Sequence, residues 1–276
     1  MNMLYLARSA TGEPLLGDDE GFVPLTAAAP PVQTVNDALG HVTEGLAGPE
    51  EASAIRVPGD SITFGAPIDR PPQLWGIGLN YTAHATDLDE TRPEAPASFL
   101  QPPHVLCGPG GPIRLPSRNI SDEITAEAEL GVVIGRTCKD VPVEEAGRVI
   151  AGYVCVIDVT AEDLVKQNPR FLTRSKRFDS FLVLGPWIAC PQTPEFDAID
   201  EWVIDTVVND EIVATNSVDE ARFSPFEIVS ELSQDTTLDP GTIIATGTPG
   251  AGQISPGDTV RADIDPIGSV SAPVTR

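Results

Sequence analysis

Two predicted β-strands that carry carboxylates inside apolar runs constrain this chain more than any other feature. The first covers residues 127–135, Glu-Ala-Glu-Leu-Gly-Val-Val-Ile-Gly, and the second covers residues 152–158 and ends at Asp158. Both are short, rich in β-branched residues and bounded by glycine, as strands typically are. Residues i and i+2 of a strand point to the same face, so Glu127 and Glu129 project side by side.

These carboxylates allow two interpretations. A buried carboxylate is costly unless it is paired or bound to a metal. On one concave sheet, Glu127, Glu129 and Asp158 would form an all-oxygen site for a hard divalent cation. Equally, Glu127 and Glu129 could lie on a solvated face of an acidic protein, and the two strands alone do not decide between these interpretations.

The charge composition limits the partners that we expect. The chain of 276 residues has 41 Asp and Glu against 17 Lys and Arg, which gives a net charge of −24. Its hydrophobic content of 41% excludes a disordered acidic chain. So many acids with only three lysines predict a halophilic protein, because salt screens the self-repulsion. We expect neither nucleic acid nor an anionic membrane as a partner.

The cysteines and the hydropathy pattern predict a cytoplasmic protein. No two of the four cysteines have C-x-x-C spacing; they are Cys107, Cys138, Cys155 and Cys190. We expect reduced thiols, since a chain of this size does not need disulfides for stability. No basic segment followed by an apolar run begins the sequence, and no apolar run reaches 18 residues. We therefore expect neither a signal peptide nor a membrane span.

Proline and glycine divide the chain. They are frequent from residue 57 to residue 72, so we expect a small N-terminal domain of residues 1–69 and a larger domain of residues 70–276. The larger domain is long enough for a sizeable core. Periodicity and caps predict strands at 3–7, 21–25, 61–64, 203–208, 211–214 and 242–245, and helices at 34–46, 143–150 and 226–232.

A possible general base follows the strand that ends at Gly78. An Asn80-Tyr81 turn opens a short acidic helix, on which His84 and Asp87 share one face. A histidine held by a carboxylate is a standard general base. Taken alone, the segment fits an ordinary histidine at a helix end, with an incidental acidic neighbour, better than a general base. The run lacks G-x-G-x-x-G, which argues against a dinucleotide site.

Two further segments could contact an anionic ligand. Lys176 lies close to two arginines in a chain with few lysines, either in a substrate site or in a solvated basic turn. Residues 246–250, Thr-Gly-Thr-Pro-Gly, form a tight loop after a buried strand. The loop offers backbone N–H groups and a hydroxyl to an anion, unless it is a simple turn.

Six short motifs occur in a specific order along residues 70–276. They are Gly78-Leu79-Asn80-Tyr81 with His84, Glu127-Ala128-Glu129-Leu130, Gly152-Tyr153 with Asp158-Val159-Thr160-Ala161, Lys176 with Phe178-Asp179, Leu184-Gly185-Pro186-Trp187, and Thr246-Gly247-Thr248-Pro249. Each motif alone is a weak signal. In this order, the set resembles the fumarylacetoacetate hydrolase family.

The resemblance implies a fold, a cofactor and an oligomeric state. The fold is α+β and mainly β, with mixed strands in a roll or distorted barrel behind a small N-terminal domain. The cofactor is a divalent metal, usually Mg²⁺, with Mn²⁺ or Ca²⁺ as alternatives. Members often form homodimers, so we expect one here.

The resemblance also assigns roles to the candidate residues. Metal ligands are the positions of Glu127, Glu129 and Asp158. Lys176 contacts the substrate or the developing enolate, and His84, with Asp87 three residues on, activates water. The remaining candidates, which we expect to bind substrate, are Asn80, Tyr81, Gly247 and Thr248.

The implied activity is that of an enzyme on a small 2-oxo acid. Family members cleave C–C bonds in acylpyruvates and β-diketo acids, or they decarboxylate, isomerise or dehydrate 2-oxo acids. We predict hydrolytic C–C cleavage of an acylpyruvate through a metal-stabilised enolate. The alternative is a 2-keto-3-deoxy sugar acid dehydratase, a lyase. Retention of every metal position and of the lysine argues against a non-catalytic binding module.

The chain departs from the family pattern at four places. Asp87 stands where many hydrolases have Glu, Glu162 where Arg is common, Gln101 where Lys is frequent, and Val213-Ala214 where Arg-Gln is usual. These positions fall in predicted substrate-facing loops, so the resemblance leaves the substrate open.

Overall fold

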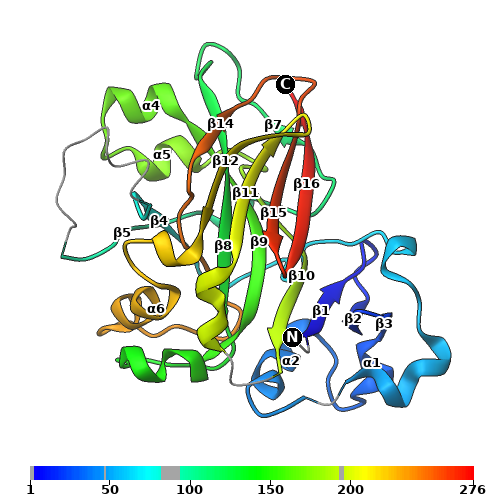
Figure 1. The fold of residues 1–276 in the computed structure, drawn as a ribbon. Helices are drawn as coiled ribbons and strands as arrows, with labels where there is room; N and C mark the ends of the chain where they lie inside the picture. The colour runs from blue at the N-terminus through cyan, green and yellow to red at the C-terminus, as the bar shows by residue number, and fades with distance from the viewer. Residues whose placement is uncertain (1–2, 47, 82–93, 193–195) are drawn as a thin grey trace.

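Two β-sheets form the framework of the protein (Figure 1). The computed structural model describes residues 3–46, 48–81, 94–192 and 196–276. The large sheet contains β1 (Met3–Arg8), β2 (Pro14–Asp18), β3 (Gly21–Pro24), β4 (Leu74–Gly78), β5 (Ala97–Leu100), β6 (Leu106–Cys107), β8 (Ile124–Ile134), β9 (Ile150–Ala161), β10 (Leu182–Pro191), β13 (Ile243–Ala245) and β14 (Ala251–Gln253). The small sheet contains β7 (Ile113–Arg114), β11 (Val203–Val208), β12 (Glu211–Ser217), β15 (Thr259–Asp265) and β16 (Gly268–Thr275).

The helices are short. The described α-helices are α1 (Leu25–Ala28), α2 (Val35–Val42), α4 (Glu162–Gln167), α5 (Leu172–Lys176) and α6 (Pro225–Ser233). Short segments of 3₁₀-helix occur at Pro49–Ile55, Gly59–Ser61, Pro103–Val105, Val143–Arg148, Phe196–Glu201 and Val218–Glu220. Capping boxes at Thr34 and Ser224 fix the starts of α2 and α6. Among the helices so described, none is both long and apolar enough to cross a membrane.

The two sheets stack as an open β-roll. The large sheet has the order β3-β2-β1-β10-β9-β8-β13-β4-β5, with β14 also on β8 and β6 on β10, and the small sheet has the order β12-β11-β15-β16-β7. Parallel pairs such as β13–β4 occur beside antiparallel ones, so the sheet is mixed. Strands β11, β15 and β16 pack across β8, β9 and β10 (Figure 1). The predicted mainly β, mixed-strand fold is confirmed, although neither sheet closes into a barrel within the described ranges.

The N-terminal strands extend the large sheet. β1 pairs antiparallel with β10, and β2 and β3 continue outward from β1. The rings of Tyr5, Phe22, Phe64 and Trp187 cluster there, with the Tyr5 and Trp187 centroids 5.0 Å apart. The division of the chain at residue 69 stays a prediction.

Strands β8 and β9 position the candidate site. They are longer than predicted and pair antiparallel, with Glu127 opposite Asp158 and Thr125 opposite Thr160. Residues that face each other in an antiparallel pair lie on the same side of the sheet, so these polar side chains share one face. The alternate residues of both strands are apolar, and the small sheet packs over β8 and β9.

The turn between β11 and β12 agrees with the prediction for residues 203–214. Asn209 and Asp210 form it with φ values of 50° and 66°, and asparagine and aspartate tolerate that region better than most residues. The predicted helix at 143–150 is instead a 3₁₀ segment, Val143–Arg148, because β9 already begins at Ile150.

Candidate active site

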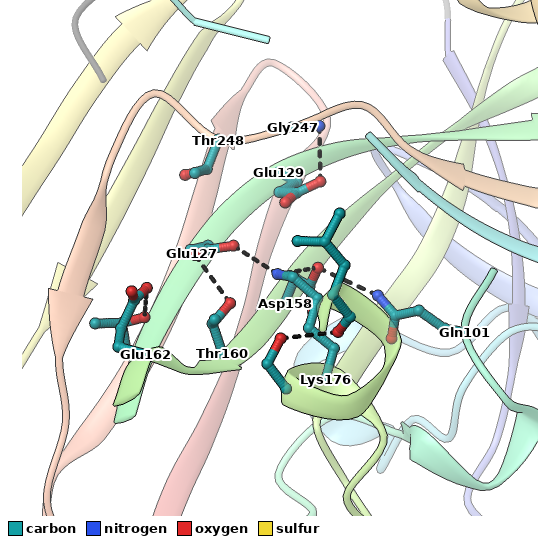
Figure 2. Close-up of polar contacts among 12 residues, drawn as sticks. Gln101, Glu127, Glu129, Asp158, Thr160, Glu162, Lys176, Gly247 and Thr248 are labelled. Carbon is teal, nitrogen blue, oxygen red and sulfur yellow. Dashed lines mark hydrogen bonds and ion pairs between the residues drawn. The ribbon is translucent and has the colours of Figure 1, made fainter. Parts of the chain in front are cut away.

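Three carboxylates meet on the shared face of β8 and β9 (Figure 2). One oxygen from each of Glu127, Glu129 and Asp158 lies within 4.8 Å of the others. Their relative exposures are 8%, 2% and 1%, so the interpretation of a solvated acidic face is wrong. Strand alternation brings Glu127 and Glu129 together, and the β8–β9 register adds Asp158.

Lys176 joins these carboxylates from the last turn of α5. Its Nζ lies 2.9 Å from Glu127 Oε2 and 2.7 Å from Asp158 Oδ2 (Figure 2). The side chain is 7% exposed, so a solvated basic turn is excluded for this lysine. Its Nζ also lies 5.7 Å from the centroid of the Phe99 ring, within reach of a cation–π interaction.

Each of the three carboxylates accepts a hydrogen bond from a group other than Lys176. Thr160 Oγ1 donates to Glu127 Oε1 at 3.0 Å, and the Gly247 N–H donates to Glu129 Oε2 at 2.7 Å. Gln101 Nε2 donates to Asp158 Oδ2 at 3.2 Å. The other oxygen, Asp158 Oδ1, is buried without a hydrogen-bond partner among the described residues, which leaves it free to ligate a cation.

The protonation equilibria reflect this burial. Burial raises the pKa of Asp158 to about 6, although the Lys176 ammonium opposes the shift. Burial and the neighbouring Asp158 hold the pKa of Glu129 well above its usual range. Burial lowers the pKa of Lys176, but the surrounding carboxylates outweigh burial and raise it, so the lysine stays charged. One ammonium therefore does not compensate three buried carboxylates.

The donor set fits a divalent cation. It consists of carboxylate oxygens alone, which hard divalent ions such as Mg²⁺ and Mn²⁺ prefer. A charge of +2 would cancel the excess negative charge that raises the pKa of two of the acids. Asp158 Oδ1 could act as a ligand without the loss of a hydrogen bond to any described residue.

The loop of residues 246–250 lies beside Glu129. Strand β13 ends at Ala245, opposite Gly131, and β14 begins at Ala251, opposite Glu127. Five loop residues therefore face only three residues of β8, so the loop leaves the sheet. Gly247 is required there, because its φ is +95° and a Cβ would lie 2.8 Å from Asn80 Cβ.

Thr206 of β11 forms hydrogen bonds both to β8 and to the end of the 246–250 loop. Its Oγ1 accepts from the Ala128 N–H at 3.0 Å and donates to the Gly250 carbonyl oxygen at 3.1 Å. Ala128 lies between Glu127 and Glu129, so Thr206 fixes the backbone of both acids. The sequence did not identify this residue, because a threonine in the predicted strand 203–208 is ordinary for a strand.

Asn80 and Tyr81 lie behind this loop. The Asn80 amide donates to the carbonyl oxygens of Phe223 and Thr246 at 3.0 and 2.7 Å. Tyr81 is 1% exposed, and burial together with Glu129 and Asp219 raises the pKa of its hydroxyl. Substrate binding by these two residues stays a prediction, and the contacts shown position the loop.

A cavity of about 150 Å³ opens beside the carboxylates. Its lining residues are Ile77, Gly78, Leu79, Phe99, Glu127, Glu129, Thr160, Glu162, Val165, Leu172, Lys176 and Thr248. Thr248 thus faces the cavity, although its hydroxyl also closes a turn by donating to the Gly250 carbonyl oxygen at 2.8 Å. His84 and Asp87 lie outside the residues that the structure describes, so the predicted general-base pair stays a prediction.

Comparison with known proteins assigns the chain to a family. The family model "Fumarylacetoacetate (FAA) hydrolase C-terminal" matches residues 73–275. The chain belongs to the fumarylacetoacetate hydrolase family. This match includes every metal, lysine and loop position discussed above, and the predicted resemblance is confirmed.

Similar members of the fumarylacetoacetate hydrolase family are enzymes with different reactions. The 5-carboxymethyl-2-hydroxymuconate delta-isomerase from Mycobacterium smegmatis has a TM-score of 0.75 and 31% identity, over 100% of this chain and 99% of its own. The maleylpyruvate hydrolase from Sphingobium sp. SYK-6, solved with manganese(II) and pyruvate, has a TM-score of 0.81 and 28% identity, over 98% of each chain. The mitochondrial oxaloacetate tautomerase fahd2 of Xenopus laevis is 33% identical over 226 residues, which cover 78% of this chain and 69% of its own.

Proposed function

We propose that the protein is a divalent-metal-dependent hydrolase that cleaves the C3–C4 bond of an acylpyruvate. The observation that carries the proposal is the group of three buried carboxylates with a buried, charged Lys176. Of these four residues, Glu127, Glu129 and Lys176 line one cavity. We propose Mg²⁺ as the ion in vivo; the Mn²⁺ in the maleylpyruvate hydrolase structure supports a divalent ion of this type.

The site residues have complementary roles in this reaction. A divalent cation on the carboxylates supplies Lewis-acid charge for the carboxylate and keto oxygens of a 2-oxo acid. The Lys176 ammonium donates to the enolate oxygen that develops when the C3–C4 bond breaks. We assign His84, oriented by Asp87, to remove a proton from the water that attacks C4.

The bonds balance with water as the only co-reactant. Water oxygen adds to C4, the C3–C4 electron pair becomes the pyruvate enolate, and C3 then takes up a proton. The products are a carboxylic acid and pyruvate. The presence of pyruvate in the maleylpyruvate hydrolase structure supports this assignment.

The alternative is a reaction that uses the same enolate without adding water. Dehydration of a 2-keto-3-deoxy sugar acid expels hydroxide from the carbon next to the enolate. The similar proteins include an isomerase and a tautomerase, which supports a reaction without water addition as the alternative.

Product analysis separates these reactions. The purified protein with Mg²⁺ should convert acetylpyruvate into acetate and pyruvate, measured by loss of enol absorbance and by chromatography. Glu129→Ala should abolish the activity. Conversion of a 2-keto-3-deoxypentonate without acetylpyruvate cleavage would refute hydrolysis.

The histidine gives a second test of hydrolysis. His84→Ala should lower kcat on the order of a hundred- to ten-thousand-fold, because water is no longer activated. Metal content should be measured in parallel, so that lost binding is not mistaken for lost chemistry. Near-normal turnover with metal bound would favour dehydration.

Two expectations from the family complete the proposal. We propose a homodimer, which light scattering of the purified protein would test. We also propose a cytoplasmic location, which fractionation of the native cells would test.

A further inference from the structure

Glu162 places a fixed negative charge on the wall of the cavity. It is the first residue of α4, which follows β9 without an intervening loop, and its side chain is half-buried. Thr125 Oγ1 donates to Glu162 Oε1 at 3.0 Å. In Figure 2, Glu162 lies on the Glu127 and Thr160 side of the site, away from Gln101. Its carboxylate is therefore held at a position separate from the three-carboxylate group.

No positive charge on the described cavity wall compensates Glu162. Lys176 is the one cationic residue among the described lining residues, and it is already bonded to Glu127 and Asp158. A divalent cation and this ammonium together only cancel the three buried carboxylates. Lys166, one turn further along α4, pairs with Glu123 and also interacts electrostatically with Glu162, but it is exposed and does not line the cavity.

Apart from the carboxylates, Lys176 and the hydroxyls of Thr160 and Thr248, the described lining residues of the cavity are apolar. Val165 lies three residues further on the same side of α4, and α4 packs against α5. On α5, Leu172 shares a face with Lys176, so one apolar and one charged group come from that helix. Apolar lining residues from β4, its end and β5 are Ile77, Leu79 and Phe99.

We infer that the cavity selects 2-oxo acids whose distal end is uncharged, and that Glu162 rejects substrates with a second carboxylate. The inference rests on the proposed function, which anchors the 2-oxo acid end at the cation and Lys176. A distal methyl group would contact the apolar wall, and a distal hydroxyl could donate to Glu162. A distal carboxylate would meet a like charge, and Lys176 is the one cation that lines the described part of the cavity.

Binding measurements test the inference independently of catalysis. The probes are 2-oxohexanoate and 2-oxohexanedioate, which have equal length and differ in the distal methyl or carboxylate group. In calorimetric titration of the Mg²⁺-loaded protein, the Kd of 2-oxohexanedioate should exceed that of 2-oxohexanoate by on the order of tenfold. The ratio of the two Kd values is the quantity to compare among variants.

Glu162→Gln should bring this ratio toward one, because glutamine keeps an acceptor for Thr125 and loses the charge. Thr125→Val is a second variant, which should also reduce the ratio by releasing the carboxylate from its fixed position. Glu211→Gln is the control: it removes one charge from an exposed residue of β12, outside the cavity, and should leave the ratio unchanged.

The outcomes distinguish this inference from the proposed function. Equal or tighter binding of the diacid, a ratio that Glu162→Gln leaves unchanged, or binding of neither probe would overturn the inference. If the preference depends on Glu162 but acylpyruvates are not cleaved, the inference stands and hydrolysis is refuted.

Discussion

Replacing Lys176 with methionine should destabilise the metal-free protein and increase its response to a divalent cation. Methionine has a similar length and no charge. The lysine side chain is 7% exposed and pairs with two carboxylates at 2.9 and 2.7 Å. Its loss removes the one cationic side chain that the described residues place among the three buried carboxylates. Removal of one partner from a buried ion pair costs about 3–5 kcal/mol.

This energy corresponds to a measurable shift of the melting temperature. For a chain of this size each kcal/mol lowers Tm by about 2 °C, so Lys176→Met in EDTA should melt roughly 6–10 °C below the wild type. A divalent cation should recover part of this loss, since it restores positive charge at the same oxygens. The rise in Tm from EDTA to Mg²⁺ should therefore be larger in the variant.

Differential scanning calorimetry in EDTA and in Mg²⁺ provides the measurement. Lys139→Met is the matched control, because Lys139 is half-exposed and faces a fully exposed Asp235 at 3.5 Å. Such surface pairs contribute little, so its Tm should not change measurably. If Lys176→Met melts with the wild type in EDTA, or if Mg²⁺ raises both proteins equally, the charge balance that we describe is wrong.

Three further predictions concern the surroundings of the site and the surface. Thr206→Val should lower the free energy of unfolding by about 1–3 kcal/mol, because the buried Ala128 N–H loses its acceptor. Thr206→Ser keeps the hydroxyl and should keep the stability. Equal denaturation midpoints for the two variants would contradict this role of the hydroxyl. Gln101→Leu should weaken divalent-cation binding about 10- to 100-fold in calorimetric titration, because Asp158 loses the donor that orients it; an unchanged Kd would remove Gln101 from the site. The midpoint of unfolding should rise between low and molar KCl, since screening relieves the repulsion of a chain with net charge −24. A flat or falling midpoint would refute halophilic adaptation.

The sequence alone determined the local geometry of the carboxylates and the family. The alternation of a strand has a period of two residues, so Glu127 and Glu129 share a face wherever the strand lies. The order of the six motifs indicated the family and its mainly β fold, which the match to residues 73–275 confirms. These features depend on residues that are near one another in the chain.

Only the tertiary structure decided which of these residues are buried and what each one contacts. The burial of Glu127 follows from the packing of β9, α4 and the small sheet against β8, which the sequence does not reveal. Gln101 reaches Asp158 across 57 residues, and Thr206 reaches Ala128 across 78. A hydrogen bond between such distant positions leaves no local periodicity, because it depends on sheet register and on packing between layers, and both are set by the whole fold.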